Sequence, residues 1–186
     1  MIGTIILSAL LAGTPYLSLK AGVGHLENHE LHFEEHTYDK GVGVAGSLGY
    51  DLGWFRYEVE LLHTRNKQGT VYNLDQSFNR DGSGTVSKTL YFVNGIFDVP
   101  IYGNDDIEGY VGAGYGFPRW QLLAGFKYSV APKWWIDLGY RFVHEPYSAR
   151  EYVDPHCVVF AGGVCSGPEP IYENHLITIG VTYTFR

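Results

Sequence analysis

A strictly alternating stretch near the end of the sequence decides the fold class. Residues 177–185 read I-T-I-G-V-T-Y-T-F, so a large apolar side chain occupies every second position. The residues between them are small or polar. Because successive side chains of a β-strand point to opposite faces, this pattern predicts a strand with one apolar face and one polar face.

The same alternation recurs along the chain and predicts eight strands. We expect them at residues 16–24, 41–52, 55–62, 86–99, 107–115, 120–129, 134–142 and 177–185. The facing of the fourth strand is ambiguous, and we favour an apolar face formed by Tyr91, Val93, Phe97 and Val99. Most segments reach the length of about 9–11 residues that a tilted transmembrane strand needs.

The predicted connections alternate between long and short. The long ones are residues 25–40, 65–85 and 147–173, and those between them are tight or moderate. Outer-membrane barrels have this asymmetry, with short periplasmic turns and long external loops. The connection at residues 116–119 is an exception, because an external loop is expected there and only four residues are available.

The composition excludes several classes of protein. The chain has 186 residues, which favours one domain, and its net charge of -7 argues against a nucleic-acid binder. An aromatic content of 16% excludes intrinsic disorder. No apolar run of about 18 residues is present, which excludes a helical membrane protein.

Alternation alone does not say which face meets water. A soluble barrel turns its apolar face inward, whereas a membrane barrel turns it outward. The polar face here is rich in Gly, Ser and Thr with isolated charges, as the narrow interior of an eight-stranded barrel requires. Aromatic residues gather at strand ends, as in an interfacial girdle. These are Tyr16, Trp54, Phe55, Tyr128, Trp134, Trp135, Tyr183 and Phe185.

We therefore predict an all-β, eight-stranded antiparallel up-and-down transmembrane β-barrel with a closed lumen. The charged residues of the polar face are expected to form a network in that lumen. Its members are Lys20, Arg56, Glu58, Glu60, Lys127, Asp137 and Arg141. Eight strands leave an interior just wide enough for side chains, so we expect no large stable conductance.

Two motifs carry a resemblance to a known family. Thr178, Gly180, Tyr183 and Phe185 resemble the C-terminal assembly signal of bacterial outer-membrane proteins, although Arg186 follows the final aromatic residue. Residues 110–116, Y-V-G-A-G-Y-G, resemble a strand of the opacity-type surface antigens, which share the fold of the OmpA transmembrane domain. The resemblance implies a bacterial outer-membrane location, assembly by the outer-membrane insertion machinery, and a role as surface antigen, adhesin or envelope-stabilising protein.

The two ends of the domain carry further expectations. Residues 1–13 are interpreted as a signal-peptide remnant or leader, with a first strand or a disordered leader as alternatives, and residues 14–186 as the barrel domain. Cys157 and Cys165 flank Gly162 and Gly163, and we favour a disulfide over two free thiols. An even pair of cysteines agrees with an oxidising compartment.

Two clusters suggest chemistry without a specific motif. His25, His29, His32 and His36 lie among acidic residues and suggest a metal-binding or pH-sensitive loop, but we favour a solvated acidic loop. The alternative of a lipid-modifying enzyme depends on His144, Glu145 and Ser148. An extended chain separates His144 from Ser148 by about 13 Å, too far for a catalytic pair.

The prediction is thus a monomeric, non-enzymatic surface protein with no cofactor, metal or nucleic acid. It is expected to bind through its external loops, at residues 25–40, 65–85 and 147–173. The expected partners are outer-membrane lipid and lipopolysaccharide, the insertion machinery, and host or surface ligands. A small pore and a soluble eight-stranded ligand carrier remain as alternatives.

Overall fold

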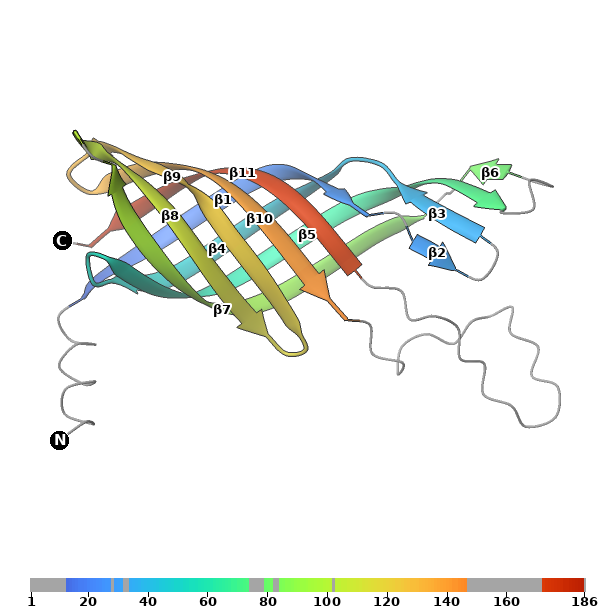
Figure 1. Ribbon diagram of the computed structural model, residues 1–186, viewed down its shortest axis with the longest axis horizontal. Helices are drawn as coiled ribbons and strands as arrows, with labels where there is room; N and C mark the ends of the chain where they lie inside the picture. Colours follow the sequence, from blue (N-terminus) through green and yellow to red (C-terminus); the bar gives the residue numbers. More distant parts are fainter. Residues whose placement is uncertain are drawn as a thin grey trace.

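The computed structural model is a closed antiparallel β-barrel of eight strands (Figure 1). It describes residues 13–27, 29–31, 34–73, 79–81, 84–101, 103–146 and 172–185. The predicted leader up to residue 12, His32, Ser148, Cys157 and Cys165 lie outside the described residues.

The barrel strands follow one another around the wall in chain order. They are β1 (Thr14–Leu26), β4 (Gly41–Asp51), β5 (Phe55–Asn73), β7 (Thr85–Ile101), β8 (Asn104–Gly116), β9 (Arg119–Ala131), β10 (Trp134–Glu145) and β11 (Tyr172–Thr184). Closure occurs at β1, where Leu19 is the register partner of both Gly46 on β4 and Val181 on β11. The predicted fold class is confirmed. Among the described residues, no helix has the length and apolarity needed to cross a membrane.

The apolar face of every barrel strand points outward. On β1, for example, Leu19 is 61% exposed whereas Lys20 is only 8% exposed. The fourth predicted strand has the facing that we favoured, since Tyr91, Val93, Phe97 and Val99 are all exposed. This arrangement is the inverse of a soluble barrel and matches a wall that meets lipid.

Two residues of the predicted aromatic girdle face the lumen instead. Tyr16 is 1% exposed and donates a hydrogen bond to Glu58 inside the barrel. Trp135 lies on the inner face of β10, where the Lys127 ammonium is 4.8 Å from its ring centroid. The prediction was wrong for these two residues because the strand period, and not the nearness to a strand end, decides which face a side chain joins.

The predicted loops at residues 25–40 and 65–85 contain β-structure. β5 and β7 continue beyond the wall, and three short strands join them: β2 (His29–Leu31), β3 (Glu34–Tyr38) and β6 (Asn79–Asp81). β3 and β6 both pair with the outer part of β5, and β2 pairs with β3. We call β2, β3, β6 and the continuations of β5 and β7 the external extension. Figure 1 shows it projecting from the end of the barrel opposite to the start of β1 and the end of β11.

The short connection near residue 117 is a two-residue turn. Gly116 and Arg119 are register partners, so only Phe117 and Pro118 lie between β8 and β9. The wall is therefore low at β8 and β9, while the neighbouring strand β7 and its partner β5 rise above it. Among the described residues, the part that protrudes farthest is therefore formed around β5 and β7.

Candidate functional site

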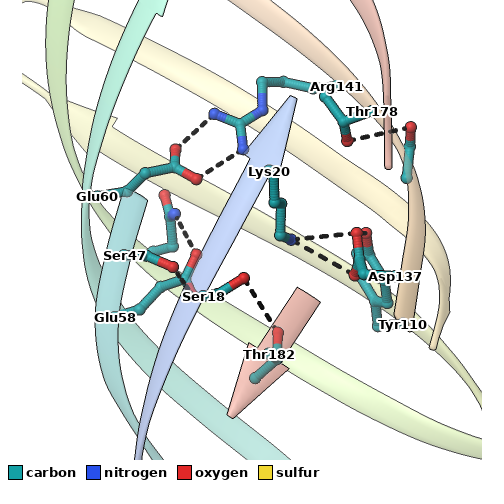
Figure 2. Close-up of polar contacts among 12 residues, drawn as sticks. Ser18, Lys20, Ser47, Glu58, Glu60, Tyr110, Asp137, Arg141, Thr178 and Thr182 are labelled. Carbon is teal, nitrogen blue, oxygen red and sulfur yellow. Dashed lines mark hydrogen bonds and ion pairs between the residues drawn. The ribbon is translucent and has the colours of Figure 1, made fainter. Parts of the chain in front are cut away.

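A bidentate ion pair lies at the centre of the lumen (Figure 2). Arg141 on β10 donates to both carboxylate oxygens of Glu60 on β5, with N–O distances of 2.5 Å and 2.6 Å. Both side chains are at most 2% exposed. Gln121 also donates to Glu60, at 3.0 Å. Such a fork-to-fork pair joins opposite walls of the barrel with a fixed geometry.

A second carboxylate, Glu58, is held by neutral donors. Its Oε2 atom accepts hydrogen bonds from the Tyr16 hydroxyl at 2.7 Å and the Ser47 hydroxyl at 2.9 Å. Its Oε1 atom accepts one from Asn94 at 2.9 Å. These donors supply the hydrogen bonds that a buried carboxylate needs.

The remaining charges form a group nearer the periplasmic end. Arg56 donates to Asp98 at 2.7 Å and 2.9 Å, and the Lys127 ammonium lies 3.2 Å from the same carboxylate. Lys127 also lies 2.8 Å from Glu108. Lys20 on β1 lies 3.4 Å from Asp137 on β10, with β11 between the two strands. The structure thus brings all seven predicted network residues into the lumen, each with a partner.

Asp98 was missed at the sequence level although a signal for it was present. The favoured facing of residues 86–99 puts Phe97 and Val99 outward, and Asp98 between them therefore points inward. The omission matters because Asp98 is the shared partner of Arg56 and Lys127.

Glycines allow two tyrosines to lie flat against the inner wall. A Cβ atom on Gly49 would lie 2.6 Å from the Tyr16 ring, and one on Gly125 would lie 2.6 Å from the Tyr110 ring. Distances this short leave no room for any side chain. Part of the glycine content therefore follows from the crowding of the lumen.

An apolar layer closes the lumen above the charges. Its buried members are Leu26, Ala45, Leu62, Leu90, Phe92, Val143, Tyr172 and Leu176, which form one contiguous cluster. We call this cluster the apolar plug. Leu62 and Val143 are the next inward positions after Glu60 and Arg141, on the external side. The sequence contains a signal for the apolar plug. The alternation of apolar and polar residues breaks where Leu62 follows Leu61 and Val143 follows Phe142, which puts an apolar side chain on the inner face.

Polar contacts tie the strands together above the plug. Glu145 on β10 accepts from Lys88 on β7 and from Arg119 on β9, both at 2.6 Å. The Lys88 ammonium lies 4.3 Å from the centroid of the Tyr172 ring. The lumen is therefore occupied by charges, then by apolar side chains, and then by this polar mouth.

The two described residues of the set suggested for catalysis, His144 and Glu145, do not lie together in one site. His144 points outward, where its Nδ1 atom lies 2.9 Å from Glu173 and its ring stacks on Trp120. Glu145, the next residue, points inward to Lys88 and Arg119. The third member, Ser148, is not described.

The histidines suggested for metal binding are only partly described. His25 is the register partner of His175 on β11, and His29 is the register partner of His36 between β2 and β3. Within the described part of the chain, no group of three or more His, Cys, Asp or Glu residues is arranged to hold a metal ion.

The residues of the predicted assembly signal occupy both faces of the closing strand. Thr178 and Gly180 face the lumen, and Gly180 makes room for Lys20. Tyr183 and Phe185 lie on the outer face with their ring centroids 5.0 Å apart. Their role in assembly stays a prediction.

Comparison with known proteins identifies the family. Residues 5–185 match the family model described as "Outer membrane protein beta-barrel domain". The chain belongs to this family. The resemblance to small outer-membrane barrels is confirmed, and the protein resides in the bacterial outer membrane.

The solved structure of Neisserial surface protein A shows the same fold, and that of Ail is a weaker match. Neisserial surface protein A is 18% identical, with 92% of this chain and 97% of that chain covered and a TM-score of 0.59. Ail of Yersinia pestis, crystallised with the heparin analogue sucrose octasulfate, is 12% identical over 93% of this chain and 99% of that chain, with a TM-score of 0.48. At 18% identity, the similarity to Neisserial surface protein A extends to the fold alone. A comparison with curated protein sequences gave no match.

Proposed function

We propose that this barrel is a non-conducting surface protein that acts by binding through its external side. The observation that carries the proposal is the contrast between a filled lumen and strands that continue outward. The apolar plug closes the barrel above the charges, whereas β5 has 19 residues and β7 has 17. Both exceed the roughly 9–11 residues that suffice to cross the bilayer.

The base of the external extension is held by backbone hydrogen bonds. Asp39 donates to the Lys67 carbonyl at 3.0 Å, and Gln68 donates to the Gly84 carbonyl at 3.0 Å. A hydrogen-bonded ribbon loses less conformational entropy on binding than an irregular loop of equal length. This supports a role as a platform for recognition of host or surface ligands.

The alternatives are less well supported by the same geometry. A pore would require a path through the apolar plug and the Arg141–Glu60 pair. A lipid-modifying enzyme would require a nucleophile, a base and an orienting group together. Of the three residues suggested for that role, His144 and Glu145 lie on opposite faces of β10.

An adhesion assay with a trimmed variant tests the proposal. Residues 68–84 are replaced by an Asn-Gly turn, which joins the register partners Lys67 and Thr85 in a two-residue hairpin. Gram-negative host cells that express either form are tested for adherence to epithelial cells and to immobilised extracellular-matrix glycoproteins. We expect the intact protein to raise adherence at least tenfold above the empty host, and the trimmed variant to lose that gain.

A matched control makes the same replacement at the other end. Pro132 and Lys133 form the periplasmic turn between the partners Ala131 and Trp134. Their replacement by Asn-Gly should leave adherence unchanged. Equal adherence of the trimmed and intact proteins, or no gain by the intact protein, would contradict the proposal.

A further inference from the structure

The outer face of β5 changes from apolar to basic on the external side. Leu61 is the last apolar outward residue, and His63, Arg65 and Lys67 follow it as exposed outward positions. In the described part of the chain, neither Arg65 nor Lys67 has an ion-pair partner. The strand neighbours of Arg65 are Val42 and Ser87, so no carboxylate faces it from β4 or β7.

We call His63, Arg65 and Lys67 the basic stripe. The hydrogen bonds of adjacent residues do not cover the two cations at its external end. Both ring nitrogens of His63 are occupied, with Thr89 at 2.9 Å and Ser87 at 3.3 Å. The acidic residue Asp39 lies beside Lys67, at the far end of the stripe, with its backbone N–H bonded to the Lys67 carbonyl. Arg65 is therefore the cation of the stripe that is best placed for an external anion.

An apolar groove lies in the lipid-facing wall next to the stripe. Its volume is about 580 Å³, and its outward lining consists of Leu19, Ala21, Val44, Ile136, Ile179 and Val181. Val44 is the register partner of both Ala21 and His63. Since neighbouring strands are about 4.8 Å apart, the groove at Ala21 lies about 10 Å from His63. Arg65 is the next outward position of β5 on the external side.

We propose that this surface binds lipid A of the outer leaflet, with a phosphate on Arg65 and Lys67 and an acyl chain in the groove. Arg and Lys are the side chains that bind phosphate, and Arg does so with a bidentate fork. The stripe begins where the apolar face of β5 ends, which is the level of the lipid headgroups. A free anion would contact the stripe but not the groove, and a purely apolar ligand would contact the groove but not the stripe.

Binding to the purified, folded barrel in detergent tests the proposal. Native mass spectrometry measures retention of diphosphoryl lipid A by the wild type and by three variants. Arg65→Gln removes the phosphate contact and should lower the affinity about tenfold or more. Ala21→Leu fills the groove with an exposed, lipid-compatible side chain and should also weaken binding severalfold. Lys133→Gln removes one charge at the periplasmic turn and should bind as the wild type does.

Two further probes separate the sources of phosphate. Dephosphorylated lipid A should bind at least tenfold more weakly than the diphosphoryl form, and inorganic phosphate at equal concentration should not displace lipid A. The proposal is overturned if Arg65→Gln binds as well as Lys133→Gln, or if dephosphorylated lipid A binds equally well. The acyl-chain half of the site would be overturned if inorganic phosphate displaced lipid A. It would also be overturned if Ala21→Leu bound lipid A as strongly as the wild type does.

Discussion

Replacement of Arg141 by methionine should destabilise the barrel through the charge that it leaves behind. Arg141 and Glu60 are at most 2% exposed and share two short hydrogen bonds. In the Arg141→Met variant, Glu60 keeps the hydrogen bond from Gln121 but loses its cation. Removal of one partner of a buried ion pair typically costs about 3–5 kcal/mol. We expect Glu60→Leu to cost a similar amount, because it leaves the Arg141 guanidinium buried and unpaired.

The double variant distinguishes this mechanism from a simple loss of packing. When both charges are replaced by apolar residues, no unpaired charge remains, and such replacements are often close to neutral. We expect the Arg141→Met/Glu60→Leu protein to lose no more than about 2 kcal/mol. Gln121 still donates one N–H to Asn94 at 2.7 Å, so its amide group keeps one hydrogen-bond partner.

Urea unfolding in lipid vesicles, followed by tryptophan fluorescence, measures these free energies of unfolding. Lys88→Met is the matched control, because the Lys88 side chain is 27% exposed and its pair with Glu145 should contribute no more than about 1 kcal/mol. If the double variant loses about the sum of the two single losses, the two residues are not coupled and the reasoning is refuted.

Four further outcomes are expected. Phe92→Ala should lower the free energy of unfolding by about 3–5 kcal/mol, because it opens a cavity in the apolar plug. Val93→Ala, on the lipid-facing wall, should lower it by less than about 1.5 kcal/mol. Urea titration measures both values. Gly139→Ala should clash with the Tyr110 hydroxyl, so adding Tyr110→Phe to that variant should restore stability in the same titration instead of lowering it further. Phe185→Ala should reduce the amount of barrel assembled in cells, measured by surface labelling, without changing the stability of protein refolded in vitro. The folded wild type should migrate differently from its boiled form in a detergent gel.

The barrel itself could be predicted from the sequence because its cause is local. Each wall strand alternates between lipid and lumen, and the alternation is visible residue by residue. Leu19 and Lys20 show this most clearly, since their different exposures follow from adjacent positions on one strand. The charged residues of the lumen could be predicted for the same reason.

The identity of the partners in the lumen depends on long-range register. Arg141 and Glu60 come from opposite walls, and nothing in either strand alone indicates that they meet. The prediction for Tyr16 was wrong because its aromatic character suggested the girdle. Tyr16 precedes the outward-facing Leu17, so the alternation turns it into the lumen, over Gly49 and beside Glu58. The phase of the alternation carries more information than residue type at such positions.

The external extension was hidden for a different reason. Residues 65–85 lack the apolar alternation of the wall, because beyond the hydrocarbon core neither face of a strand meets lipid acyl chains. The pairing of β5 with β7 nevertheless continues up to Lys67 and Thr85, through backbone hydrogen bonds that require no apolar face. Periodicity therefore finds the strands that cross the membrane and misses their continuations.

Conductance across a planar lipid bilayer tests the closed lumen most directly. The Arg141–Glu60 pair, the apolar plug and the Glu145 contacts follow one another along the lumen, and an aqueous path would have to pass all three. We predict that the purified, folded wild-type protein, inserted in a planar bilayer, produces no stable current steps. Reproducible steps on the nanosiemens scale would contradict the closed lumen and, with it, the proposal that the protein acts through its external surface.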